Sequence, residues 1–83
     1  MDLVSATRDF TEKRRIADAA LQALIDAGAD YVSATTPYER TLRRAALEAA
    51  ETDYATKNEA AREARRVMGN LSAGIGSIGS SRR

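Results

Sequence analysis

Apolar residues recur at helical spacing along the first third of the chain. Placed at about 100° per residue, one set of them falls within about 100° of arc. The set is Leu3, Ala6, Phe10, Ala17, Leu21, Leu24 and Ile25. Gly28 follows the last of them, at the place where a left-handed residue commonly ends a helix. The pattern predicts a helix over residues 3–27, with Asp2, Ser5 and Asp9 as alternative caps.

A second, longer helix is indicated by Thr36-Pro37-Tyr38-Glu39, which is a capping box with proline at the first helical position. No glycine or proline interrupts the chain from there until Gly69. We therefore expect a helix over residues 37–68. Its apolar arc is rich in alanine and consists of Leu42, Ala46, Ala49, Ala50, Ala60, Ala64, Val67 and Met68.

Residues 28–36 are expected to form the connecting loop, and two helices joined by a short loop pack antiparallel. The predicted fold is thus all-α: an antiparallel, coiled-coil-like two-helix hairpin over residues 1–68, with the longer helix second. Residues 69–83 are rich in Gly and Ser and predict an irregular tail, flexible or docked on a partner. Gly74 to Gly79 fit the letters of a dinucleotide-binding loop, but the strand that such a loop must follow is missing.

Alanine dominates the apolar composition. It supplies 17 residues, whereas Leu, Ile, Val and Phe together supply 14 of the 83. An alanine contact removes little apolar surface per residue, so a single hairpin offsets its conformational entropy poorly. We therefore expect self-association or docking on a larger protein. The predicted interface residues are Phe10, Leu21, Leu24, Leu42, Ala46, Ala49, Val67, Met68, Ile75 and Ile78. Val67 and Met68 are expected to extend past the cover of the first helix.

Three charged residues fall within the predicted apolar arcs: Arg14 on the first helix, and Asp53 and Lys57 on the second. If Ala27 faces the start of the second helix, Arg14 comes within reach of Asp53. One interpretation is a polar cluster that fixes helix register or copy number. The other is that these long side chains reach to the edge of a narrow seam.

Arginine outnumbers lysine 11 to 2, and the spacing Arg-x-x-Arg-Arg occurs twice in the second helix. The two triplets are Arg40, Arg43 and Arg44, and Arg62, Arg65 and Arg66. They are candidate phosphate contacts, because the guanidinium fork suits phosphate oxygens. Glutamates lie among them and the net charge is only +1, so an ordinary solvated helix face is favoured over a nucleic-acid site.

The residue types exclude several kinds of chemistry. The chain has neither Cys nor His, which removes disulfides, thiol and histidine catalysis and most transition-metal sites. A two-helix hairpin encloses no cleft for paired carboxylates. We expect no enzymatic activity, no cofactor, no small-molecule substrate and no metal. The N-terminus does not read as a secretory signal and no stretch is long enough to span a membrane, which predicts a cytoplasmic protein or one inside a particle assembled there.

The function that these observations favour is a non-enzymatic structural or adaptor subunit that binds itself or a larger assembly. In size, and in having Pro37 before a long helix, the chain resembles in outline the hairpin subunits that polymerise in type III secretion needles. It also resembles small helical proteins of bacteriophage particles. It departs from the needle subunits at Gly69-Asn70 and matches no family motif, so no residue role is carried over. The alternatives are a small nucleic-acid-binding protein and a regulator that folds only on its target.

Overall fold

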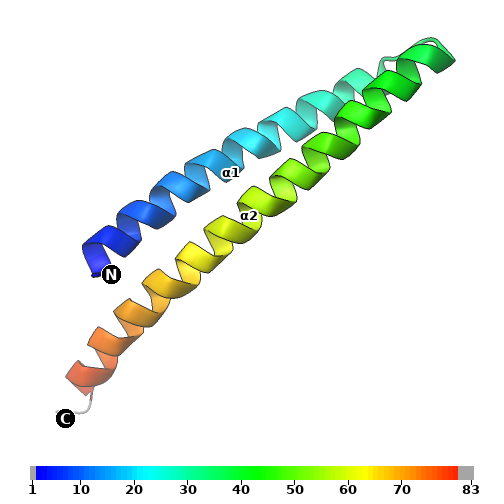
Figure 1. The fold of residues 1–83 in the computed structure, drawn as a ribbon. Coiled ribbons are helices and arrows are strands. Elements are labelled where there is room, and N and C mark those ends of the chain that lie inside the picture. Colours follow the sequence, from blue (N-terminus) through cyan, green and yellow to red (C-terminus); the bar gives the residue numbers. More distant parts are fainter. Residues whose placement is uncertain (1, 81–83) are drawn as a thin grey trace.

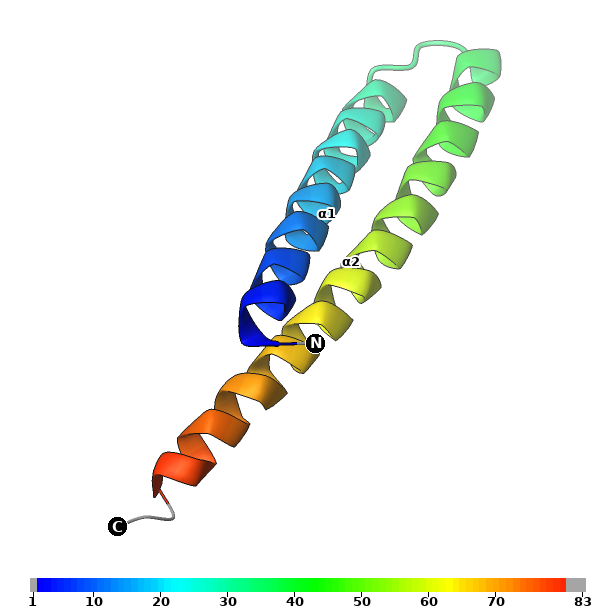
Figure 2. The same ribbon diagram turned by 60° about the vertical axis from the view of Figure 1, so that its left-hand side comes forward.

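The computed structural model describes residues 2–80, with side chains as far as Gly74. Helix α1 (Leu3–Val32) and helix α2 (Pro37–Ser80) run antiparallel and are joined by residues 33–36. Figures 1 and 2 show two rods side by side, with α2 continuing past the N-terminal end of α1. The molecule measures 68 × 20 × 14 Å. The predicted all-α hairpin with a longer second helix is confirmed.

Both helices begin at side-chain caps. The Ser5 amide donates to the Asp2 carboxylate at 2.7 Å, which selects Asp2 among the three candidate caps. At α2 the Glu39 amide donates to the Thr36 hydroxyl at 3.1 Å, as the capping box predicts. The Glu39 carboxylate accepts from the Thr35 amide at 3.1 Å, one residue before the amide that we expected.

The helices meet along a seam whose residues are spaced alternately by three and four positions. On α1 these buried or half-buried residues are Leu3, Ala6, Phe10, Lys13, Ala17, Ala20, Leu24, Ala27 and Tyr31. On α2 they are Arg43, Leu47, Ala50, Tyr54, Lys57, Ala61, Ala64, Met68 and Leu71. This spacing is the heptad pattern of a left-handed coiled coil.

The centre of the seam is made of alanine. Ala17 and Ala61 are each 1% exposed, and Ala20 and Ala64 are nearly as well covered. Ala6 and Ala34 complete the buried set, and no larger side chain is fully buried among the residues described. The fully buried core is therefore made of alanine methyl groups, and the larger side chains of the seam stay half-buried.

The predicted end of α1 at residue 27 is wrong, because the helix continues through Gly28 to Val32. No glycine in the described part of the chain has a positive φ, so Gly28 does not act as a left-handed cap. Tyr31 is half-buried at the next seam position and extends the helix–helix contact by one turn. Ser33 caps the helix instead, and its amide donates to the Ala29 carbonyl at 3.1 Å.

Helix α2 likewise continues through Gly69 and Asn70, beyond the predicted end at residue 68. A glycine inside a helix costs only about 1 kcal/mol, and Leu71 at the next seam position is half-buried. Val67 and Met68 are half-buried too, so the expectation that they lie beyond the cover of the first helix is wrong. Because α1 is longer and the loop is shorter than expected, the N-terminal end of α1 lies beside Val67 and Met68.

The seam is turned away from the predicted arcs near the loop. Leu21, Ile25 and Leu42 were expected to face the partner helix, but they are 37%, 56% and 54% exposed. A seam of period 3.5 drifts by about 20° per heptad on a straight helix of period 3.6. A single helical projection at about 100° per residue assumes one fixed contact direction along the whole helix. It therefore misplaces the contact residues near the helix ends.

We expect Gly28→Ala to stabilise the hairpin by about 0.5 to 1 kcal/mol, because Gly28 is helical and an added Cβ meets no atom within 4 Å. The measurement is thermal unfolding followed by circular dichroism at one protein concentration. Ala29→Gly, at the next exposed position, is the matched control and should lower stability. Destabilisation by Gly28→Ala would contradict a helix that continues to Val32.

Enlarging a side chain at the centre of the seam should force the helices apart. We expect Ala61→Leu to cost about 1 to 3 kcal/mol, since Ala61 is 1% exposed and has no room for a larger group. Ala55→Leu, on an exposed face of the same helix, is the control and should leave the free energy of unfolding nearly unchanged. Equal effects of the two substitutions in urea unfolding would show that α2 does not pack through Ala61.

Candidate interaction surface

The predicted interface residues divide into two groups in the structure. Phe10, Leu24 and Met68 lie in the seam between α1 and α2, and Val67 is half-buried beside it. The others whose side chains are described are exposed, namely Leu21, Leu42, Ala46 and Ala49. Ile75 and Ile78 belong to the part of α2 whose side chains lie outside the described residues. Of the predicted interface residues, the four exposed ones are accessible to another molecule.

The predicted polar cluster of Arg14, Asp53 and Lys57 is not assembled across the hairpin. Arg14 pairs with Asp18 on its own helix at 3.3 Å, and Lys57 pairs with Asp53 at 2.9 Å. Only Lys57 lies in the seam, whereas Arg14 and Asp53 are exposed.

The helix register accounts for this separation of Arg14 from Asp53. Arg43 of α2 donates to the Asp30 carbonyl of α1, which places residue 14 level with about residue 59. Arg14 then lies roughly 9 Å along the axis from Asp53, at about 1.5 Å per residue.

The seam contains an internal repeat that the sequence reasoning missed. Residues 44 positions apart occupy equivalent seam places on the two helices. The matched pairs are Leu3 and Leu47, Ala6 and Ala50, Phe10 and Tyr54, Lys13 and Lys57, Ala17 and Ala61, Ala20 and Ala64, and Leu24 and Met68. The ion pair of Asp9 with Lys13, at 3.1 Å, likewise repeats as that of Asp53 with Lys57. A search for self-similarity at heptad positions would have found both the repeat and the seam lysines.

The two arginine triplets do not form equivalent sites. Arg43 caps the end of α1, donating to the Asp30 carbonyl at 2.9 Å and to the Ser33 hydroxyl at 3.3 Å. Arg44 pairs with Glu48 at 3.5 Å, and Arg66 pairs with Glu63. Arg40, Arg62 and Arg65 are exposed and form no ion pair among the residues that the structure describes. Each triplet therefore contains at least one arginine whose guanidinium group is already bound to another group of the hairpin.

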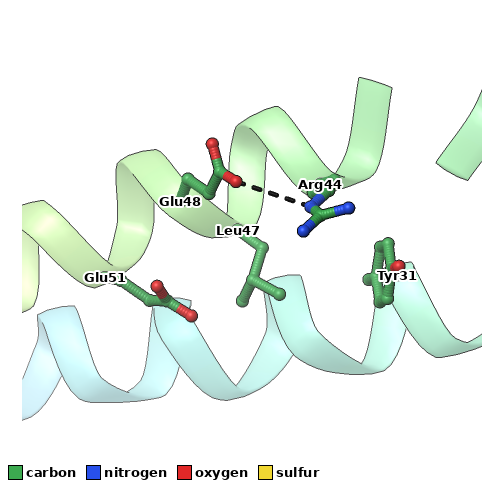
Figure 3. Close-up of a pocket in the computed structure, with 5 residues that line it drawn as sticks. All are labelled: Tyr31, Arg44, Leu47, Glu48 and Glu51. Atoms are coloured by element: carbon green, nitrogen blue, oxygen red, sulfur yellow. Dashed lines mark ion pairs between the residues drawn. The ribbon is translucent and has the colours of Figure 1, made fainter. Parts of the chain in front are cut away.

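A hollow lies between the helices near the loop (Figure 3). Tyr31 from α1 and Leu47 from α2 form its apolar part, and the Arg44–Glu48 ion pair borders it on α2. Glu51 completes the lining, and the volume is about 310 Å3. Its charged groups are exposed and one pair is already neutralised, so the hollow does not enclose a reactive centre.

The exposed large hydrophobic residues follow two lines rather than scattering over the surface. Of the six, Val4, Leu21, Ile25 and Val32 each come one position after a seam residue of α1, and Leu42 comes one position before a seam residue of α2. On each helix these residues belong to a row that lies one position from the seam and has the same alternating spacing of three and four. We call these two rows the outer lines. The α1 outer line is Val4, Thr7, Thr11, Arg14, Asp18, Leu21, Ile25, Gly28 and Val32. The α2 outer line is Leu42, Ala46, Ala49, Asp53, Thr56, Ala60, Glu63, Val67 and Asn70.

The two outer lines lie on opposite broad faces of the hairpin. One position along a helix is a turn of about 100°. Because α1 and α2 run antiparallel, one position forward on α1 and one position back on α2 turn in the same sense when both are viewed from one end. The seam residues of α1 and α2 point towards each other. Turning both directions by about 100° in the same sense therefore makes the two outer lines point to opposite faces of the hairpin.

The described part of the chain carries no metal cluster and no membrane-spanning helix. Within the described residues no group of three or more acidic side chains is arranged to hold a metal ion. No helix in that part of the chain is long and apolar enough to cross a membrane. No family model matches the chain, and neither a curated protein nor a solved structure is significantly similar to it.

The α2 cap predicts a pH dependence of stability. The hydrogen bond from the Thr35 amide holds the pKa of the Glu39 carboxyl below its ordinary value of 4.5. A carboxyl with a lowered pKa stabilises the fold above its unfolded-state pKa and ceases to do so as the pH falls through its folded-state pKa. We expect Glu39→Gln to lower the melting temperature at pH 7 and to approach the unsubstituted protein's value near pH 3. A difference independent of pH would contradict the role of the carboxylate charge.

Proposed function

We propose that this chain is a non-enzymatic structural subunit that associates with copies of itself in a larger assembly, such as a phage particle or a secretion-type assembly. The single observation that carries the proposal is that the hairpin fully buries alanine and no larger side chain among the described residues, while six large hydrophobic residues are exposed. Burial of large apolar side chains is the main favourable term in folding, so an isolated hairpin of this kind is marginal.

The surface area supports the same proposal. A compact monomer of 9.0 kDa exposes about 4,900 Å2, whereas this chain exposes 6162 Å2. The excess is larger than the roughly 800 Å2 that each partner contributes to an interface of standard size. A rod of these proportions therefore has enough surface to bury against neighbours.

The nucleic-acid alternative has less support. Arg43 holds the end of α1, and Arg44 and Arg66 are paired with glutamates. A phosphate would have to compete with these contacts. It would also meet the carboxylates that lie between the triplets, including Glu51 and Glu59.

Sedimentation of the whole chain over a concentration series, with helicity recorded on the same samples, tests the proposal. We expect a helical species whose mass rises with concentration and changes little between low and physiological salt, because apolar contacts are weakly screened. A helical monomer at every concentration would contradict self-association. Binding to a DNA duplex that weakens steeply with salt would favour the nucleic-acid alternative.

A further inference from the structure

We propose that copies of the chain join by packing the α1 outer line of one hairpin against the α2 outer line of the next. This inference rests on the self-association proposed above and adds which surfaces meet and with what symmetry. The partner on each face is a second copy of the same chain. The two lines hold five of the six exposed large hydrophobic residues, and apart from half-buried Gly28 and Val67 their residues are exposed in the hairpin.

The two lines match in spacing and level. Both alternate steps of three and four residues, so they can form a heptad contact like that of the seam. Within one hairpin Arg43 of α2 lies level with Asp30 of α1, since it donates to the Asp30 carbonyl. A neighbour in the same orientation and at the same height therefore brings its Val32 level with Leu42. Continuing along the two outer lines in steps of four and three residues, Gly28 of the neighbour comes opposite Ala46, and its Ile25 comes opposite Ala49.

The lines complement each other in side-chain size at one place near the loop, where Ile25 comes opposite Ala49, whereas Leu21 comes opposite Asp53. Near the loop the α1 line presents bulky side chains separated by Gly28, whereas the α2 line presents the short side chains of Ala46 and Ala49 after Leu42. Bulky groups can enter the spaces above alanines, as knobs enter holes in a coiled coil. At the far end Val4 comes level with Val67 and Asn70. Both ends of the proposed contact are therefore at least partly apolar.

The charged middle of the contact is compatible with the same register. On the α1 line Arg14 comes level with Ala60 and the next residue along, Glu63. Arg14 is paired with Asp18 and Glu63 with Arg66 on their own helices, but these side chains are more than half exposed, so an opposite charge on a neighbour can also reach them. A register shifted by one heptad would bring Arg14 level with Asp53 instead, so the charges are compatible with both registers, and exposed pairs contribute little to affinity.

The symmetry of the assembly follows from the position of the lines. Each contact uses one α1 line and one α2 line, and the two lie on opposite faces of every hairpin. A pair joined in this way therefore still presents one free line of each kind. Such a heterologous contact propagates, giving a ring if the rotation closes and a filament if it does not. A contact between two identical lines would instead stop at a dimer.

Two single substitutions, each blocking one line, test this arrangement. Ile25→Lys places a charge on the α1 line, and Ala49→Lys places one on the α2 line. Both positions are exposed, so the hairpin itself should still fold, which circular dichroism checks. Ala29→Lys and Ala45→Lys add the same charge on the sides of α1 and α2 that face away from the seam, and these are the matched controls.

Each blocked variant alone should associate at least tenfold more weakly than the unsubstituted chain, and the controls should behave like it. An equimolar mixture of the two variants should form a species of two chains and nothing larger, because each supplies the line that the other retains. Association of both variants at the unsubstituted level would overturn the inference while leaving the proposed function intact. A variant that still dimerises by itself would overturn it in favour of a contact between identical lines. No association of the unsubstituted chain would instead overturn the proposed function.

Cysteine cross-linking tests the orientation of the copies, since the chain has no native cysteine. Chains carrying Ile25→Cys and chains carrying Ala49→Cys are mixed and oxidised. We expect a mixed disulfide dimer, because positions 25 and 49 are opposite each other in the proposed register. Preferential cross-linking of Ile25→Cys to Glu63→Cys, the position opposite residue 25 when the neighbouring hairpin is inverted over the same span, would overturn the parallel orientation of the hairpins.

Discussion

Alanine at the centre of the seam is the constraint on which the rest of the structure depends. Ala17, Ala20, Ala61 and Ala64 are nearly or fully covered and form the buried part of the seam between the helices. Small side chains at both heptad positions let the backbones come close but remove little apolar surface from water. Larger seam residues such as Phe10 and Tyr54 are only half-buried, and the level set by the Arg43–Asp30 hydrogen bond places them opposite alanines of the other helix. A well-fitted but weakly stabilised hairpin follows from this arrangement.

The two lysines in the seam add to this weakness. Lys13 and Lys57 each keep an aspartate partner one turn earlier on their own helix, with about two fifths of each lysine side chain exposed. Their stems can cover the alanines while the ammonium groups reach solvent. Because the same unit occurs in both halves of the 44-residue repeat, the two helices are similar in the seam but differ on their outer lines. The outer faces therefore distinguish one helix from the other for a neighbouring molecule.

The parts of the fold that local chemistry determines could be predicted from the sequence. The capping box at Thr36 and Glu39 places the start of α2, and the absence of glycine and proline after Pro37 predicts its length as far as Gly69. The end of α1 could not be predicted locally, because Gly28 reads as a terminator and only the tertiary contact of Tyr31 extends the helix past it. The predicted arcs failed near the loop because supercoiling shifts the contact line by a small angle in every heptad. Residues such as Leu42 and Ala49 consequently belong to the outer surface, which is where an interface with another molecule needs them.

The dependence of thermal stability on protein concentration tests the central claim most directly, namely that a hairpin with an alanine core gains much of its stability from neighbouring copies. Association of the folded form stabilises it by mass action, so the melting temperature must rise with concentration. We predict that the melting temperature rises steadily as the protein concentration is raised over two to three decades, on the order of several degrees for a small domain. A melting temperature that is high and the same at every concentration would show that the isolated hairpin is stable by itself, and would contradict the account.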